Sequence, residues 1–248
     1  MAKHKSGAPP GLPSRCDGIV LRVHKQAAKQ LFLEIYTVQE GLLRVLTEKG
    51  RGVRKGMPAA PLPFSKISFE IYRQGNVRIL SEYECAVNRY LQNLTWNEYV
   101  YSQIFTELFL ALVPQQEADP ALYRLLSQYA DAVCVKDCRI VTIIAGWQLL
   151  SLTGFAPDPA TVRLYRTGAA GAGETILSDE DAGAEWREER LTPAFRAFWR
   201  RVLEYDWDRR ETVRFSAKGL ALLEDLLYAY VSQCSERRLK SISFLSSL

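Results

Sequence analysis

The chain has 248 residues, 48% hydrophobic and 24% charged, with a formal net charge of +4 at pH 7. This composition is typical of a globular protein with a sizeable core. The longest apolar run, residues 140–152, is shorter than the ~20 residues that cross a bilayer, and the polar N-terminus lacks the apolar segment of a secretory signal. Five scattered cysteines argue against a disulfide framework. We therefore expect a cytoplasmic protein without membrane contact.

Residues 1–15 contain several prolines and glycines, which predict a flexible N-terminal arm. The segments that follow alternate apolar and polar residues, are rich in β-branched and aromatic side chains, and are separated by turn signals. They predict five strands, at residues 18–25, 31–38, 42–49, 64–73 and 77–84. Tight turns are expected at residues 39–41 and 74–76, and a long loop at 50–63. Five short strands favour an OB-fold barrel over residues 16–84, and an SH3-like barrel is the alternative.

Beyond residue 84 the hydrophobic period changes from two to about 3.6, which indicates an all-α domain over residues 85–248. Thr95 is a candidate N-cap, Asp119 and Pro120 form a second helix start, and Gly154 is a stop signal. The pattern predicts helices at residues 95–112, 119–133, 138–152, 192–203 and 215–239. The expected fold class is therefore α+β multidomain, with an N-terminal five-stranded OB-fold barrel followed by an all-α helical domain.

Residues 156–191 interrupt the helical pattern. They contain the glycine-rich sequence GAAGAGE and, from residue 174 to 189, seven acidic residues against a single arginine. This composition predicts an exposed, partly disordered acidic insertion. Cys134 and Cys138 are one helical turn apart, but no second Cys or His pair accompanies them. They are therefore interpreted as two small residues on a helix, and no metal or other cofactor is expected.

Positive charge is concentrated near the N-terminus. Up to Leu80 there are 14 Lys and Arg against 5 Asp and Glu, whereas from Ser81 onward there are 18 against 23. A net charge of +9 in the first 80 residues is typical of a region that meets nucleic acid. Base-stacking candidates are Phe32, Tyr36, Phe69 and Tyr72, although alternation buries about half of them. The candidate DNA-binding cations are Arg22, Lys25, Lys29, Arg44, Lys49, Arg51, Arg54, Lys55 and Arg73.

Residue patterns of known catalytic sites are scarce in this sequence. His4 and His24 are its only histidines, the glycines at 168–173 follow no predicted strand, and no GxxxxGK phosphate-binding loop occurs. The acidic run at 179–181 is interpreted as a solvated surface. These features argue against a hydrolase, and we expect a protein that is not an enzyme.

Several short motifs resemble, in chain order, those of the RecO family of bacterial recombination mediators. They are GIVLR at residues 18–22, EGLLRVLTEKG at 40–50, LPF at 62–64, LTGFAPD at 152–158 and RRLKSISFL at 237–245. The resemblance implies an OB-fold joined to a helical domain. It also implies a protein that binds single- and double-stranded DNA, anneals complementary strands, and helps to load RecA onto strands covered by single-stranded-DNA-binding protein.

The same resemblance implies partners and site residues. The partners are RecR, the acidic C-terminal tail of single-stranded-DNA-binding protein and, indirectly, RecA. The family's basic loop after the third strand corresponds here to Lys49, Arg51, Arg54 and Lys55. Binding of the acidic tail requires cations and an apolar pocket on the helical domain, for which helix position suggests Arg124, Arg139 and Trp147.

The region after the GFAPD motif departs from the family pattern. Many relatives carry a four-cysteine zinc ribbon there, whereas this chain has no cysteine between Cys138 and Cys234 and places its acidic insertion at that point. We therefore expect a zinc-free member of the family, located in the cytoplasm and associated with the nucleoid.

A second interpretation belongs to a different class of protein. An interaction adaptor whose basic barrel binds an acidic partner, and never DNA, agrees with the same charge pattern. Competition separates the two interpretations, because an acidic peptide displaces the ligand of an adaptor and oligonucleotides do not bind it.

Overall fold

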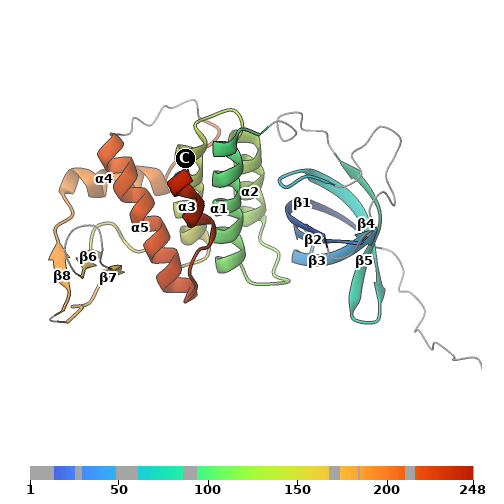
Figure 1. The fold of residues 1–248 in the computed structure, drawn as a ribbon, viewed down its shortest axis with the longest axis horizontal. Helices are drawn as coiled ribbons and strands as arrows, with labels where there is room; N and C mark the ends of the chain where they lie inside the picture. The colour runs from blue at the N-terminus through green and yellow to red at the C-terminus, as the bar shows by residue number, and fades with distance from the viewer. Residues whose placement is uncertain are drawn as a thin grey trace, which may run out of the picture. The chain divides into compact units, whose positions relative to one another are not determined.

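The computed structural model describes residues 14–25, 30–48, 61–85, 94–167, 174–183, 185–209 and 216–247. These residues form two compact units (Figure 1). The barrel unit contains the described residues up to Leu94 together with residues 114–130, and the helical unit contains residues 95–113 and the chain from Asp131 onward. Within the described ranges, no helix combines the length and the apolar character that a membrane span requires.

The barrel is built from β1 (Ser14–Lys25), β2 (Gln30–Thr37), β3 (Gly41–Glu48), β4 (Lys66–Gln74) and β5 (Val77–Cys85). These strands close in the order β1-β2-β3-β5-β4, and β4 pairs back with β1. Neighbouring strands are antiparallel except β3 and β5, which run parallel. A closed five-stranded barrel of this order confirms the predicted OB-fold.

The strand boundaries agree with the sequence prediction to within a few residues, with one correction at the N-terminus. β1 begins at Ser14, so the last two residues of the expected flexible arm are strand residues. Ser14 pairs with Ile71 and Arg15 with Glu70, both on β4. Prolines cannot donate a hydrogen bond to a neighbouring strand, so they predict a segment outside the sheet. The last of them is Pro13, and the strand begins at the next residue.

Inward-facing and outward-facing residues alternate along the strands, and the inward-facing apolar side chains fill the interior of the barrel. Burial of these apolar side chains removes them from water, which is the main favourable contribution to folding. Their neighbours along each strand necessarily point outward and form the outer surface. The inward-facing core residues are Cys16, Val20, Leu33, Ile35, Leu43, Val45, Ile67, Phe69, Ile71, Leu80, Tyr83 and Cys85.

Residues 114–130 belong to the barrel unit, although their helical period predicts that they are part of the helical domain. They include most of α2 (Pro120–Ala132), whose Tyr129 ring lies 5.3 Å from the ring of Phe64 just before β4. A hydrophobic period of 3.6 locates a helix and its buried face. It does not tell which unit that face contacts.

The close approach of this segment to the barrel requires a glycine at position 41. Gly41 has a φ of 70°, and a Cβ on it would lie 2.2 Å from the carbonyl oxygen of Glu117. Only glycine tolerates both the left-handed conformation and the lack of space. The segment that contains Glu117 thereby lies against the β2–β3 end of the barrel.

The helical unit is built from α1 (Trp96–Leu112), α3 (Cys138–Leu152), α4 (Pro193–Leu203), α5 (Ala217–Ser235) and a 3-10 helix (Ser241–Ser247). The four α-helices are confirmed predictions, and the 3-10 helix was not predicted. Thr95 caps α1 in a complete capping box with Glu98, and Thr192 caps α4 before a proline.

Helix α3 lies in the core of the helical unit, as its apolar residues on most sides predict. The ring of Trp147 packs edge-on against that of Trp199 at 4.5 Å, and its indole N–H donates to the carbonyl oxygen of Leu223 at 3.2 Å. Gly146 is so close to α5 that an added Cβ would lie 2.5 Å from the side chain of Leu227. Both tryptophans are therefore structural.

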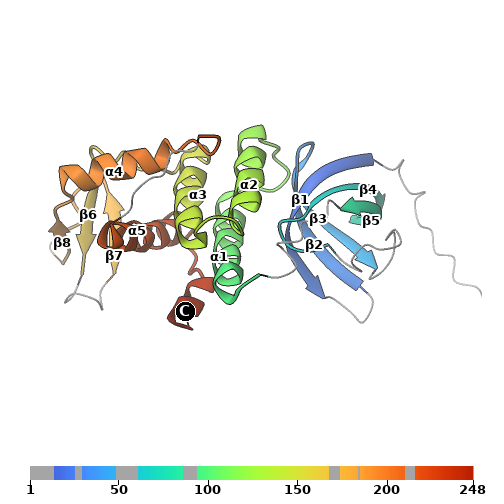
Figure 2. The same ribbon diagram turned by 90° about the horizontal axis from the view of Figure 1, so that it is seen from above.

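Residues 156–191 contain a small sheet in their described part, which the prediction of an all-α domain did not include. β6 (Arg163–Arg166) lies between β7 (Thr175–Ser178) and β8 (Arg187–Glu189). Figure 2 shows these strands next to α4 and α5. The side-chain amide of Gln233 on α5 donates to the carbonyl oxygen of Leu177 and accepts from its N–H. Strands of three or four residues contain too few apolar positions to be predicted from a sequence that is otherwise acidic and rich in glycine.

Candidate nucleic-acid interface

The outer face of β1, β2 and β3 carries three rows of side chains, set by the strand register. In the first row Ile19 pairs with Tyr36 and Tyr36 with Leu42, and all three are buried. The Tyr36 hydroxyl accepts a hydrogen bond from the N–H of Asp119 at 3.0 Å, and Leu42 forms a bridge with Gln115. Residues 114–130 therefore cover this row and leave the other two to be considered as binding surface.

The second row is polar and consists of Arg22, Glu34 and Arg44, which are paired across the three strands. We call it the Arg–Glu–Arg row. Nη1 of Arg22 lies 3.7 Å from one Glu34 carboxylate oxygen, and Nε of Arg44 lies 3.2 Å from the other. The glutamate side chain is 7% exposed, whereas those of the arginines are 31% and 51% exposed, respectively. Two partly exposed guanidinium groups thus flank a buried carboxylate.

The third row is mainly apolar and extends farther around the barrel. His24 pairs with Phe32, Phe32 with Leu46, Leu46 with Ile79, and Ile79 with Tyr72. We call these five residues the apolar belt. His24 is exposed and the other four are half-buried. Planar rings beside guanidinium groups are the combination with which proteins bind a single strand, because rings stack on bases and cations contact phosphates.

The structure places only some of the predicted DNA-binding cations. Arg22 and Arg44 lie on the Arg–Glu–Arg row, while Lys25 at the end of β1 and Arg73 at the end of β4 are exposed. Of the proposed stacking residues, Phe32 and Tyr72 belong to the apolar belt, whereas Tyr36 and Phe69 are buried. The remaining candidates lie outside the described residues: Lys29, Lys49, Arg51, Arg54 and Lys55.

The described barrel residues by themselves carry no excess of positive charge. Residues 14–25, 30–48 and 61–85 contain seven Lys and Arg and seven Asp and Glu. The net charge of +7 that the chain carries up to Cys85 therefore comes from residues 1–13, 26–29 and 49–60, which contain seven Lys and Arg and no acidic residue. These residues lie outside the described ranges, but their sequence accounts for the positive charge of the N-terminal region.

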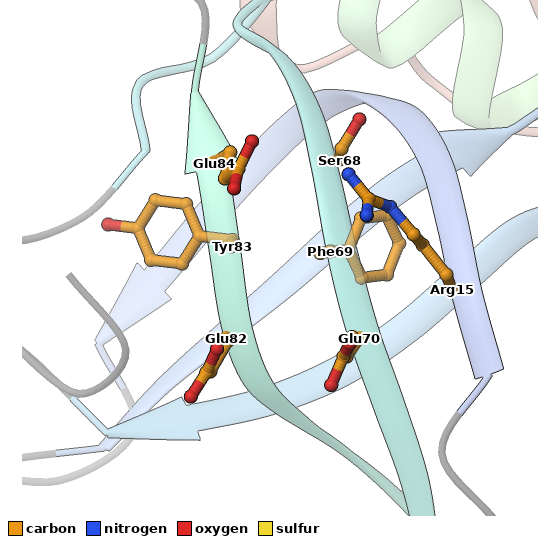
Figure 3. Close-up of a pocket in the computed structure, with 7 residues that line it drawn as sticks. All are labelled: Arg15, Ser68, Phe69, Glu70, Glu82, Tyr83 and Glu84. Atoms are coloured by element: carbon orange, nitrogen blue, oxygen red, sulfur yellow. The ribbon is translucent and has the colours of Figure 1, made fainter. Parts of the chain in front are cut away.

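The outer face of β1, β4 and β5 is acidic. A shallow pocket of about 70 Å³ there is lined by Arg15, Ser68, Phe69, Glu70, Glu82, Tyr83 and Glu84. Figure 3 shows the carboxylates of Glu70 and Glu82 on neighbouring strands, where the register places these two residues directly opposite each other. This surface repels phosphate, so nucleic acid is expected on the other face.

The three suggested partner-binding residues differ in burial and in pairing. Trp147 is fully buried, so it cannot contact a partner, which corrects that assignment. Arg139 is engaged by the buried carboxylate of Glu224, to which its Nε donates at 2.7 Å. Arg124 is exposed on α2 and belongs to the barrel unit, whereas the other two belong to the helical unit. Helix position could not reveal these differences in burial and pairing.

The Glu224 carboxylate is a structural centre of the helical unit. It accepts hydrogen bonds from the hydroxyls of Tyr101 and Tyr228 at 3.2 and 3.0 Å, in addition to the Arg139 contact. Burial and the neighbouring carboxylate raise the pKa of Tyr101. A buried charge with three partners agrees with the rule that such groups are fully hydrogen-bonded, and it indicates a packing role.

Cys134 and Cys138 lie at the start of α3 and are small, partly buried residues. Cys138 is the first helical residue, but Cys134 lies in the preceding turn, so the helical interpretation is correct only for Cys138. Burial raises the pKa of the Cys134 thiol to about 11, which disfavours the thiolate needed for metal binding. No cluster of three potential metal ligands occurs among the described residues.

A closed five-stranded OB-fold barrel followed by a helical unit places the chain in the class of two-domain OB-fold proteins. Residues 13–89 match the family model for the N terminal of recombination protein O, and residues 94–242 match the model for its C terminal. The chain therefore belongs to the RecO family of DNA repair proteins.

Two relatives are similar along almost their whole length. The DNA repair protein RecO of Symbiobacterium thermophilum is 26% identical over 247 residues, which cover 94% of this chain and 96% of the relative. The DNA repair protein RecO of Desulforamulus reducens is 22% identical over 246 residues, which cover 94% of each chain. The resemblance identified from short motifs is thereby confirmed.

Proposed function

We propose that this protein is a non-enzymatic mediator of recombinational DNA repair that binds single- and double-stranded DNA through its barrel and anneals complementary strands. The observation that carries this proposal is the open surface formed by the Arg–Glu–Arg row and the apolar belt. It places cations beside half-buried rings on the β2–β3 face, where OB-fold barrels bind oligonucleotides. Membership of the RecO family supports the same conclusion.

The cation-rich segments add an electrostatic contribution that needs no base sequence. Residues 26–29 and 49–60 connect strands of the barrel, and together they contain five Lys and Arg without an acidic residue. Cations near a phosphate backbone release condensed counterions, which raises affinity for any nucleic-acid sequence. The proposed ligand is therefore a strand recognised by its backbone and its base faces.

Fluorescence anisotropy of labelled oligo-dT, titrated at low and physiological salt, tests the proposal. Binding should weaken with salt, with a log–log slope of about −0.7 for each phosphate neutralised. The same preparation should accelerate annealing of complementary oligonucleotides. Folded protein that binds neither single nor double strands would refute the proposal. Displacement of its ligand by an acidic peptide would then favour an adaptor.

We further propose that the protein acts with RecR, binds the C-terminal tail of single-stranded-DNA-binding protein, and thereby assists loading of RecA in the cytoplasm at the nucleoid. Support comes from the family alone. Of the three suggested partner-binding residues, Arg124 is the one that is exposed. Calorimetry with the tail peptide and with RecR measures both contacts, and absence of heat for either removes that partner.

A further inference from the structure

Glu34 occupies a position that the surrounding alternation should expose. Its neighbours Leu33 and Ile35 point into the barrel core, so Glu34 points outward, yet its side chain is only 7% exposed. Arg22 on β1 and Arg44 on β3 flank it in the strand register and form ion pairs with it. A buried acid thus lies at the centre of the surface proposed to bind a polyanion.

The carboxylate is held by charge more than by hydrogen bonds. Its Oε2 atom has no hydrogen-bond partner in the described structure, and the nearest cation, Nη1 of Arg22, is 3.7 Å away. A buried charge with so few direct partners is costly unless nearby opposite charges compensate it. The two arginines provide that compensation through their positive charge, which would otherwise attract only a phosphate.

We propose that Glu34 is an internal counter-anion of the DNA-binding surface, which competes with the phosphates of a bound strand for Arg22 and Arg44. The inference rests on the proposed function and adds a regulation of affinity to it. In the free protein the carboxylate prevents repulsion between the two guanidinium groups. In the complex it remains within reach of them and weakens their attraction for phosphate, so that the strand is released readily.

The competition has a defined sign, which separates it from a role of Glu34 in orienting the arginines. Replacing Glu34 by glutamine keeps its size and removes its charge. If the carboxylate competes, Glu34→Gln frees about one phosphate contact, which corresponds to an additional slope of ~0.7 and about fivefold tighter binding at 0.1 M salt. If the carboxylate only orients the arginines, the same substitution weakens binding.

Glu70→Gln is the matched control, because Glu70 lies on the outer face of β4, in the acidic pocket on the other side of the barrel. Both substitutions change the net charge by the same amount. Oligo-dT anisotropy at several salt concentrations should show the fivefold gain and the steeper slope for Glu34→Gln only. Equal effects of the two substitutions, or weaker binding by Glu34→Gln, would overturn the inference.

A second pair of variants keeps the test decisive if Glu34→Gln alone does not fold. Arg44→Gln and the double variant Glu34→Gln/Arg44→Gln differ only in the carboxylate, and the double variant removes both members of an ion pair. The double variant should bind oligo-dT more tightly than Arg44→Gln, because Arg22 is then free of competition. Equal affinity of Arg44→Gln and the double variant refutes the inference. If the unmodified protein does not bind oligo-dT at all, the proposed function itself is refuted.

Discussion

The two outer faces of the barrel differ in the way they arrange charge, although they share β1. On the face of β1, β2 and β3, Glu34 lies between two arginines, and a row of half-buried rings and aliphatic side chains runs beside it. On the face of β1, β4 and β5, Glu70 and Glu82 lie opposite each other. The described barrel as a whole has no net charge, so the difference lies in the arrangement. Regional net charge therefore cannot identify a binding face, whereas strand register can.

The largest expected effect comes from breaking the contact that covers one row of the first face. Gly41→Ala forces a left-handed alanine into the space occupied by Glu117. We expect a loss of about 3 kcal/mol or more in the free energy of unfolding, from backbone strain and overpacking together. Urea denaturation followed by circular dichroism measures it.

Gly75→Ala is the matched control for this substitution. Gly75 has a similar φ of 61° in the β4–β5 turn, but nothing lies within 4 Å of an added Cβ. Its replacement should cost only the backbone strain, about 1 kcal/mol. Equal losses for the two variants would show that the contact of Gly41 with Glu117 contributes nothing to stability.

The second prediction concerns the cations in the segment between β3 and β4, which lie outside the described residues of the two faces. Replacing Arg51, Arg54 and Lys55 by alanine together should flatten the salt dependence of oligo-dT binding by about two slope units, or about 100-fold in affinity at 0.1 M salt. These residues belong to the segment with four cations and no acid between β3 and β4. An unchanged slope would exclude this segment from the contact with the strand.

The third prediction tests the apolar belt of the first face. Phe32→Leu keeps an apolar side chain but removes the ring, and it should weaken oligo-dT binding about tenfold, since stacking of a base contributes ~1–3 kcal/mol. Phe32→Tyr keeps the ring and should bind like the unmodified protein. Anisotropy at fixed salt compares the two. If leucine and tyrosine behave alike, Phe32 does not stack on a base.

Local signals explain what the sequence could predict. The cap at Thr95, the proline after Thr192 and the turn at Gly75 each depend on one or two adjacent residues, and the helices and hairpin that they predict are present. Alternation likewise located the five strands. In contrast, Arg22, Glu34 and Arg44 come together only through the register of three strands, which includes a bulge in β1 between Val20 and Arg22. Alternation alone would not reveal that shift.

Contacts between segments that are distant in sequence explain two further differences between the predicted and the observed structure. Leu164 and Leu177 pair in the small sheet of the helical unit, but each lies in a four-residue strand within an acidic, glycine-rich stretch. Trp147 resembled a partner-binding residue by its place on a helix, and its burial depends on Trp199, which is distant in sequence. Contacts between distant segments decide both cases.

The smallest expected effect concerns the acidic face and has the opposite sign to most substitutions. Glu70 and Glu82 are directly opposite each other on antiparallel strands, an arrangement in which like charges destabilise a sheet. Glu82→Gln should therefore raise the free energy of unfolding by about 0.5 kcal/mol at low salt. It should change oligo-dT affinity less than twofold at physiological salt, where the Debye length is about 8 Å. Urea denaturation at low and high salt measures the stabilisation, which should diminish as salt screens the repulsion. If the variant is less stable than the unmodified protein, the Glu82 carboxylate has a favourable partner, such as Arg15 in the same pocket, whose attraction outweighs the repulsion. The carboxylates of the pocket would then be compensated by positive charge, and the surface would not repel phosphate.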